Sequence, residues 1–305
     1  MFKSTTEFTS QYYMNNNTEL ANNYELIKQI GKGSFGEVYL AKDKFDNLYA
    51  TKVEEKKKKQ RLRSEYNIYK KIFGNENVFG IPKIYSYQET TDYNIMVMEL
   101  LGPSLENVFD TFDRSLTINF IYKLAIDMIN IIEQVHSFGF IHRDIKPNNF
   151  LFNYQKNSES YKTLYLMDFG LSKKYIQHGK HISFKSDRNL IGTARYASLN
   201  IHMGLEPSRR DDLESICYVL IYLQKGKLPW QGLKGNKKIS QIEKIGDKKL
   251  EVTPESLCDG LNSAFVKFLK YCRDLNFQDK PDYLYIKQLF NADIIKHKII
   301  PSYDS

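Results

Sequence analysis

The segment at residues 142–149, which reads His-Arg-Asp-Ile-Lys-Pro-Asn-Asn, constrains this chain more than any other stretch. It places Asp144, Lys146 and Asn149 close together, and if the segment is a loop their side chains converge on one point. There the carboxylate can accept a proton from a hydroxyl group, the ammonium group can contact a phosphate, and the amide oxygen can coordinate a metal ion. The segment therefore predicts a site that acts on a hydroxyl group and a phosphate.

A glycine-rich turn near the N-terminus supplies a second part of such a site. Gly31-Lys32-Gly33-Ser34-Phe35-Gly36 lies between two β-type runs, Tyr24–Ile30 and Phe35–Lys42. Glycines let backbone amides approach a phosphate without obstruction by Cβ. Rossmann folds share this pattern, but there a helix follows the turn, whereas here a strand follows it. The order predicts a hairpin that covers phosphate groups.

A lysine on the next predicted strand is the third part. Leu48–Glu54 is β-type and carries Lys52, and a helix is predicted from about Leu62 to Phe73. A lone lysine on a strand is usually solvated, and a glutamate on an amphipathic helix is usually a surface charge. In this context Lys52 is predicted to hold phosphates, with Glu65 as the partner that fixes its ammonium group.

Asp168-Phe169-Gly170 is the fourth part. It ends a short predicted strand, Leu164–Met167, and Asp168 follows Asp144 by 24 residues. An acidic residue at the end of a strand can coordinate magnesium. The long amphipathic segment from Thr117 to Ser137 is predicted to be a core helix that leads into residues 142–149.

Composition agrees with a folded chain. The 305 residues are 42% hydrophobic, which is enough for two lobes or one large domain. We find no apolar run of the roughly 18 residues that would span a bilayer. The N-terminal segment lacks the apolar core of a signal peptide. The three cysteines form neither a disulfide framework nor a metal-ligand pattern. We therefore expect a soluble, intracellular protein.

These residues resemble the eukaryotic protein kinases and, more narrowly, the casein kinase I family. The likeness covers about Tyr24 to Phe290. Most kinases close the activation segment with Ala-Pro-Glu, and the place is taken here by Ser198-Leu199-Asn200, which resembles the variant of this family. The narrow match rests on Leu100–Glu106, Gly192–Ser198, Ser208–Ser215, Leu228–Lys234 and Asp279–Tyr283.

The resemblance implies an α+β, bilobal protein kinase fold. A small, mainly antiparallel β N-lobe with one major helix is expected over residues 24–101, up to the hinge. A larger, mainly α-helical C-lobe is expected over residues 102–297. Residues 1–23 are expected to form a flexible, Asn-rich N-terminal tail and residues 298–305 a short C-terminal tail.

The resemblance also implies a serine/threonine protein kinase that uses ATP and Mg²⁺. In this role Asp144 orients the substrate hydroxyl and accepts its proton, while Lys146 stabilises the γ-phosphoryl group. Lys52, held by Glu65, grips the phosphates. The metal ligands are Asn149 and Asp168. The implied ATP-binding residues are Ile30, Gly31, Gly33, Ser34, Gly36, Val38, Ala50, Lys52, Met98, Glu99, Leu101 and Leu151.

A basic surface beside the catalytic loop implies acidic or phosphorylated protein substrates. Arg195 and Lys238 are the implied substrate anion site. Gln241 stands where relatives carry a lysine, and this departure weakens the expectation that substrates must be primed by a phosphate. Further departures from the family pattern are Asn148 for Asp, Pro207 for Gln and Cys217 for Gly.

Two other interpretations are less well supported. A pseudokinase usually lacks the equivalent of Lys52, Asp144 or Asp168, and all three are present. The net charge of +8 raises the possibility of a nucleic-acid-binding protein, but the charges are dispersed among acidic residues rather than gathered on one face with aromatic platforms. We expect an active, monomeric kinase in the cytoplasm or nucleus, without specific nucleic-acid binding.

Overall fold

The computed structural model describes residues 23–33, 36–57, 61–73, 78–154, 163–235 and 240–303. The predicted N-terminal tail up to residue 22, Ser34 and Lys238 lie outside the described residues. The chain divides into two compact units. One extends to Gly102 and also contains Asp168–Gly170, and the other contains Pro103–Met167 and the chain from Leu171 onward.

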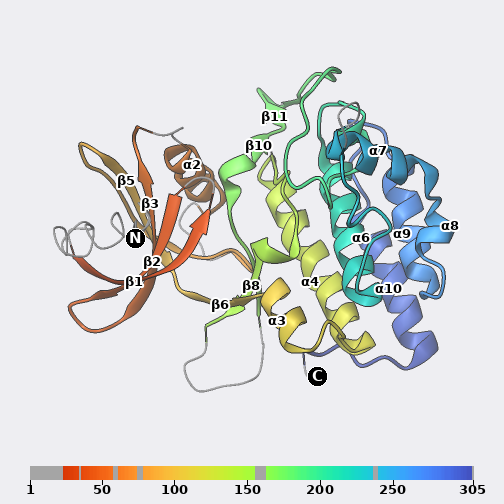
Figure 1. Ribbon diagram of the computed structural model, residues 1–305, viewed down its shortest axis with the longest axis horizontal. Coiled ribbons are helices and arrows are strands. Elements are labelled where there is room, and N and C mark those ends of the chain that lie inside the picture. Colours follow the sequence, from red (N-terminus) through yellow and green to blue (C-terminus); the bar gives the residue numbers. More distant parts are fainter. Residues whose placement is uncertain are drawn as a thin grey trace. The chain divides into compact units, whose positions relative to one another are not determined.

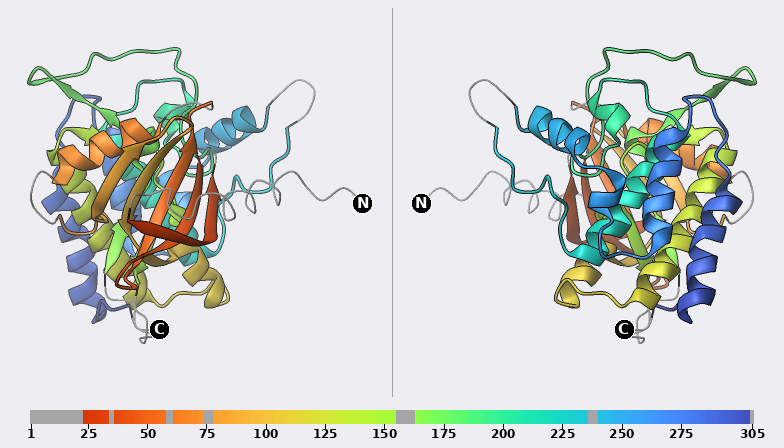
Figure 2. Two further views of the ribbon diagram at one scale, coloured as in Figure 1. Left: turned by 90° about the vertical axis from the view of Figure 1, so that its left-hand side faces the viewer. Right: turned by 90° about the vertical axis from the view of Figure 1, so that its right-hand side faces the viewer.

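The first unit is built on a five-stranded antiparallel sheet with the strand order β1-β2-β3-β5-β4 (Figures 1 and 2). One face of the sheet buries Tyr39, Val53 and Val97 in a hydrophobic cluster. The cluster also takes Ala41 on the strand of Tyr39 and Ile95 on the strand of Val97, each two residues away, because successive residues of a strand point to opposite faces. The strands are β1 (Tyr24–Gly33), β2 (Gly36–Asp43), β3 (Leu48–Glu55), β4 (Ile84–Glu89) and β5 (Tyr93–Glu99).

The helix of this unit, α2 (Leu62–Phe73), packs against β4 and β5. Leu62, Tyr69 and Ile72 are buried, and their spacing of seven and three residues puts them on one helical face. The same face carries Glu65, which is also buried. The buried face of the helix therefore carries a carboxylate and a phenol.

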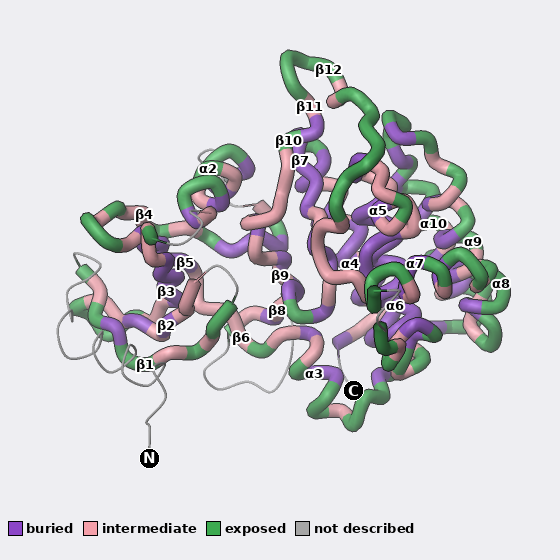
Figure 3. The backbone as a smooth tube through the Cα atoms, turned by 45° about the horizontal axis from the view of Figure 1, so that its top comes forward, coloured by how far each residue is buried: buried purple, intermediate pink, exposed green. Residues whose placement is uncertain are grey.

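The second unit is mainly helical, as Figure 1 shows. Its core follows α4 and α6, which carry long buried stretches (Figure 3). Helix α6 contacts α4 and α9, and α10 contacts α4 and α9. The helices are α3 (Leu105–Thr111), α4 (Ile118–Ser137), α5 (Leu199–His202), α6 (Arg209–Lys225), α7 (Gln241–Glu251), α8 (Pro254–Leu257), α9 (Ser263–Asp274) and α10 (Tyr283–His297).

Short strands complete this unit and carry its loops. The segment at residues 142–149 connects β7 to β8. Each of these two strands is held by a partner strand, because β7 pairs with β10 and β8 pairs with β9. The strands are β7 (Phe140–Ile141), β8 (Phe150–Asn153), β9 (Leu164–Leu166), β10 (Lys173–Lys174), β11 (Ile176–Gln177) and β12 (Lys180–His181), and β6 (Leu101–Ser104) stands at the sequence boundary of the two units.

The segment after α10 is anchored by one aromatic side chain. Tyr303 is buried, and its hydroxyl group donates a hydrogen bond of 2.6 Å to Asp127 Oδ2 on α4. Its ring meets the rings of Phe120 and Phe152 edge-on, each at a centroid distance of 5.1 Å. The end of the described chain is thus attached to α4 and to β8.

The predicted fold class is confirmed: in the part of the chain that the structure describes, one unit has an antiparallel sheet with one helix, α2, and the other unit is mainly helical. The glycine-rich turn leads into a strand, β2, which rules out the Rossmann arrangement. The sequence analysis did not identify β4. None of the helices among the described residues combines the length and the apolar character needed to cross a bilayer.

Candidate active site

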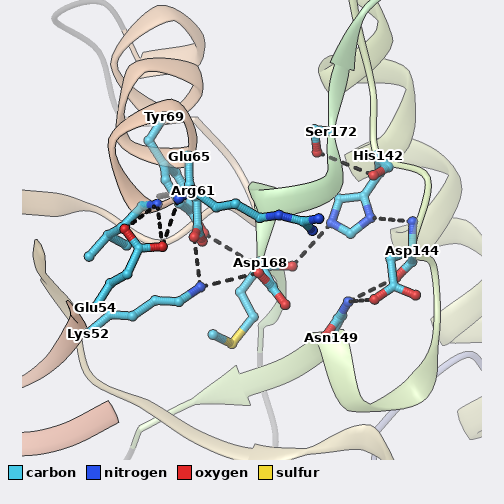
Figure 4. Close-up of polar contacts among 12 residues, drawn as sticks. Lys52, Glu54, Arg61, Glu65, Tyr69, His142, Asp144, Asn149, Asp168 and Ser172 are labelled. Carbon is cyan, nitrogen blue, oxygen red and sulfur yellow. Dashed lines mark hydrogen bonds and ion pairs between the residues drawn. The ribbon is translucent and has the colours of Figure 1, made fainter. Parts of the chain in front are cut away.

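An ion-pair triad lies in the sheet unit (Figure 4). Lys52 Nζ on β3 is 2.7 Å from Glu65 Oε2 on α2 and 3.2 Å from Asp168 Oδ1. Burial by itself would lower the pKa of Lys52, but the two carboxylates outweigh this effect and raise it. Lys52 is therefore a fixed positive charge at neutral pH, and Glu65, the partner predicted for it, is the nearer of its two carboxylate partners.

Glu54 fixes the start of the helix that carries Glu65. Its buried carboxylate accepts hydrogen bonds from the backbone N–H groups of Arg61 (2.7 Å) and Leu62 (3.1 Å). It also accepts one of 3.0 Å from Asn94 Nδ2 on β5. The first N–H groups of a helix have no partner within the helix, and a carboxylate satisfies them well. Because Glu54 and Lys52 are two residues apart on β3, both point toward α2.

Tyr69, one turn after Glu65, connects α2 to Asp168. Its hydroxyl oxygen accepts a hydrogen bond of 3.3 Å from the backbone N–H of Asp168, and its ring meets that of Phe169 edge-on at 4.9 Å. Asp168 has φ +67°, a left-handed conformation that is uncommon for residues other than glycine. A strained backbone of this kind persists only where its surroundings hold it.

The glycine-rich turn joins β1 and β2, with Gly33 paired with Gly36. Gly36 has φ +148°, and a Cβ atom there would lie 2.4 Å from the carbonyl oxygen of Val53. Only glycine allows the hairpin to lie this close to β3. Of the other predicted residues of this turn, Gly31 lies on β1 opposite Val38 of β2, Ile30 is 45% exposed, and Ser34 lies outside the described residues.

Two of the residues implied to bind ATP lie opposite each other on neighbouring strands. Ala50 on β3 pairs with Met98 on β5, and both are buried. The backbone N–H of Glu99 donates to the carbonyl oxygen of Lys83 at 2.8 Å. Leu101 begins β6 in the sheet unit. Leu151 lies on β8 of the helical unit.

The segment at residues 142–149 forms the second group of site residues, in the helical unit. Asp144 accepts a hydrogen bond of 2.6 Å from Lys146 Nζ at Oδ2 and one of 2.8 Å from Thr193 Oγ1 at Oδ1. Asn149 Nδ2 donates to the carbonyl oxygen of Asp144 at 2.8 Å (Figure 4). The structure thus brings together Asp144, Lys146 and Asn149, as their spacing predicts.

His142 folds this segment back on itself. Its Nδ1 accepts a hydrogen bond of 3.3 Å from the backbone N–H of Asp144, and its Nε2 lies 3.1 Å from the carbonyl oxygen of Met167. Since a carbonyl oxygen only accepts, these contacts fit a neutral ring with its proton on Nε2. The imidazole therefore ties the residue before Asp168 to the loop that carries Asp144.

Asp212, near the start of α6, braces the same loop. Its carboxylate accepts hydrogen bonds from the backbone N–H groups of His142 (2.7 Å) and Arg143 (2.8 Å), and lies 2.9 Å from His136 Nε2. Burial would raise the pKa of Asp212, but these donors outweigh it and lower the pKa. Arg143 has φ +68°, a conformation that this double hydrogen bond helps to hold.

The predicted substrate anion site is only partly described. Arg195 lies with its guanidinium carbon 5.7 Å from the ring centre of Tyr196 and 5.9 Å from that of Tyr222. Lys238 lies outside the described residues. Gln241 Nε2 donates a hydrogen bond of 2.9 Å to the carbonyl oxygen of Leu233, so this amide group already has an acceptor.

Oxygen ligands suited to magnesium are present. Mg²⁺ prefers carboxylate, amide and phosphate oxygens, and proteins commonly supply only one or two of its ligands. Asp168 supplies a carboxylate beside Lys52. The amide nitrogen of Asn149 is used within the loop, so the oxygen of the same amide is the atom that a metal would meet. Among the described residues there is no cluster of three or more His, Cys, Asp or Glu side chains able to hold a metal by themselves. Each of these two oxygen donors suits a metal that arrives with phosphate ligands.

Sequence reasoning missed three residues that position this site: Glu54, Thr193 and Tyr69. The signal for Glu54 was its place two residues after Lys52 on the same strand. Thr193 belongs to Gly192–Ser198, which was recognised as a motif without a role for its hydroxyl group. Tyr69 lies within the predicted helix from Leu62 to Phe73, but nothing in the sequence indicates that its hydroxyl oxygen accepts a hydrogen bond from the backbone of Asp168.

Comparison with known protein families supports the assignment. Residues 24–293 match the model of the protein kinase domain, which is most of the chain. The match includes the glycine-rich turn, Lys52, Glu65, the loop with Asp144, and Asp168. Proteins of this family are phosphotransferases that use ATP and Mg²⁺. The antiparallel sheet and the helical unit agree with this match. The chain therefore belongs to the protein kinase family.

Proposed function

We propose that this protein is a serine/threonine kinase of the casein kinase I type. It transfers the γ-phosphate of ATP to serine or threonine hydroxyl groups in acidic or phosphate-primed proteins. The observation that carries this proposal is the environment of Asp144, whose two carboxylate oxygens accept from Lys146 and Thr193. A lysine two residues after the aspartate supports a preference for serine and threonine.

Each residue has one role in the reaction. The substrate hydroxyl oxygen forms a bond to the γ-phosphorus, the bond to the ADP oxygen breaks, and Asp144 accepts the hydroxyl proton. Lys146 stabilises the charge on the transferred group. Lys52, held by Glu65, binds the phosphates. Asp168 and Asn149 would hold magnesium, which neutralises phosphate charge when bound.

The substrate preference rests on charge and on one substitution. Arg195 is a guanidinium group in the segment that follows Thr193, and it suits acidic side chains or phosphate. Gln241 provides no charge where relatives carry lysine, and its amide is bonded to Leu233. We therefore propose that acidic peptides are good substrates and that a priming phosphate adds only a modest gain.

We further propose that the enzyme acts as a monomer on proteins in the cytoplasm or nucleus, without specific nucleic-acid binding. Its charges of both signs are interspersed along the chain, which argues against one continuous cationic face.

Transfer of radioactive phosphate from ATP tests the proposal directly. The full chain is incubated with three peptides that share one serine: an acidic peptide, a peptide primed with phosphoserine and a neutral peptide. We expect the acidic and primed peptides to be labelled with similar kcat/KM and the neutral peptide more slowly. A tyrosine version of the acidic peptide should remain unlabelled. Labelling of tyrosine alone, or of no peptide, would contradict the proposed function.

A further inference from the structure

Lys249 is a buried lysine that the catalytic roles leave unused. It lies near the end of α7, and its exposed fraction is 0%. Burial lowers the pKa of Lys249 to about 7, although the nearby Glu214 carboxylate opposes this effect. Lysine is almost never fully buried without partners, because an ammonium group loses its hydration there. The contacts of Lys249 therefore indicate what holds it in place.

The ammonium group of Lys249 binds backbone. Nζ donates to the carbonyl oxygens of Ala194 (2.9 Å) and Ala197 (2.5 Å). It also lies 4.9 Å from the ring centres of Tyr218 and Trp230, within the range of a cation–π interaction. These contacts enclose the ammonium group and join α7 to the turn at residues 194–197.

Two further buried or half-buried side chains bind the same turn. Trp230 Nε1 donates a hydrogen bond of 2.8 Å to the carbonyl oxygen of Arg195. His202 Nε2 lies 3.0 Å from the carbonyl oxygen of Ala194 and donates to it, since a carbonyl only accepts. Three of the four carbonyl groups from Ala194 to Ala197 thus accept from side chains located elsewhere in the fold.

The turn leads directly to the catalytic carboxylate. The backbone N–H groups of Tyr196 and Ala197 donate to the carbonyl oxygen of Thr193 at 2.9 and 3.0 Å. Thr193 Oγ1 in turn donates to Asp144 Oδ1 at 2.8 Å. A chain of contacts therefore runs from Lys249 through one turn to Asp144, and Arg195 lies within that turn.

We propose that Lys249 is a positioning residue for phosphoryl transfer. With Trp230 it fixes the turn at residues 193–197, and through this turn it sets the positions of the Asp144 carboxylate and the Arg195 guanidinium group. The proposal rests on the proposed function, in which Asp144 and Arg195 meet the substrate. If Lys249 only filled space, methionine, which has a side chain of similar length, could replace it without loss of activity.

Lys249→Met tests the proposal, with Lys248→Met as its matched control. Lys248 is the neighbouring lysine on α7, and its ammonium group contacts Glu251 at the surface, 2.8 Å away. For each full-length protein, kcat and KM are measured with acidic and neutral serine peptides, together with KM for ATP. Hydrogen exchange is followed at the amides of Tyr196 and Ala197, which report on the turn without any substrate.

We expect Lys249→Met to lower kcat/KM for the acidic peptide roughly 10- to 100-fold, because small displacements in an active site have effects of this size. The loss for the neutral peptide should be smaller, KM for ATP should stay within about 2-fold, and the turn amides should exchange faster. Lys248→Met should match the wild type. A Lys249→Met protein with wild-type kcat/KM and wild-type exchange, whatever its melting temperature, would overturn the proposal.

Trp230→Phe covers the case in which Lys249→Met does not fold. It removes the single hydrogen bond to Arg195 and keeps most of the aromatic surface. We expect faster exchange in the turn and a fall in kcat/KM for the acidic peptide of roughly 2- to 10-fold, the value of one hydrogen bond. Wild-type exchange and wild-type kcat/KM in the Trp230→Phe protein would overturn the proposal that the turn positions Asp144 and Arg195. If the wild type labels no peptide, the proposed function fails, whereas the exchange measurements still decide whether Lys249 fixes the turn.

Discussion

Tyr69 accepts a hydrogen bond from the backbone of Asp168, with 3.3 Å between the phenol oxygen and the amide nitrogen. Four residues earlier on the same helix, Glu65 contacts Lys52. One helical face therefore holds both the lysine that would bind phosphates and the aspartate that would bind magnesium. The position of α2 determines both at once, and a substitution on this face should affect ATP more than the peptide substrate.

Tyr69→Phe removes the accepting oxygen and keeps the ring against Phe169. A single hydrogen bond contributes about 0.5–1.5 kcal/mol. We expect KM for ATP to rise roughly 2- to 10-fold while KM for the peptide stays constant, as measured by initial rates at saturating concentrations of the second substrate. Tyr66→Phe on the same helix is the control. An unchanged KM for ATP would show that the hydrogen bond from Asp168 to Tyr69 does not orient the aspartate.

Asp144→Asn tests the proton acceptor. The amide retains the shape of the side chain but cannot take a proton from the substrate hydroxyl. We expect kcat to fall by about 10²- to 10⁴-fold, the usual contribution of general base catalysis, with nucleotide affinity unchanged. Asp113→Asn, at an exposed position, should retain full activity. Turnover of casein by the Asp144→Asn protein at the wild-type rate would refute the role of Asp144.

Glu54→Gln tests the clamp at the start of α2. The neutral amide has one acceptor oxygen where the carboxylate has two, so at least one of the contacts to Arg61, Leu62 and Asn94 is lost or weakened. Hydrogen bonds to charged groups contribute about 1.5–3 kcal/mol. We expect the free energy of unfolding, from urea titration, to fall by an amount within this range, and the Kd for ATP to rise. A loss of stability with unchanged ATP affinity would mean that Glu54 does not act through Glu65.

His202 should make the protein sensitive to acid. Burial, helped by the Lys249 ammonium group, lowers the pKa of His202 from its ordinary value of 6.5 to about 4. Between these two values the unfolded chain binds a proton that the folded protein does not, so this contribution to stability is complete above about pH 6.5 and is lost as the pH falls toward 4. We expect His202→Gln to lose less unfolding free energy than the wild type between about pH 7 and pH 5. Parallel curves for the two proteins would contradict this account.

Short motifs with strict chemistry could be predicted from the sequence. Five site residues stand in patterns whose spacing reflects one reaction: Lys52, Glu65, Asp144, Asn149 and Asp168. In the structure, one unit brings together Lys52, Glu65 and Asp168, and the other brings together Asp144 and Asn149. Their catalytic roles remain predictions that the experiments above address.

Residues that act on backbone atoms could not be predicted in this way. Lys248 and Lys249 are identical in type and adjacent in sequence, yet one contacts Glu251 and the other is fully buried. Neighbours on a helix point about 100° apart, so the rotation of α7 decides which of them faces the turn at residues 194–197. That rotation depends on packing between α5 and α7, which are distant in sequence. Glu54 was missed for a similar reason, since the N–H groups it accepts from carry no sequence signal.

Tyr303 sets a practical limit for anyone who shortens this enzyme or attaches a reporter to it. Its ring fills a space beside Phe152, and Phe152 is only three residues beyond Asn149. A truncation that removes Tyr303 would remove the ring that packs against β8, the strand that follows the catalytic loop. A deletion chosen to discard an apparent tail would therefore also loosen the active site. Fusions should therefore be joined after residue 303.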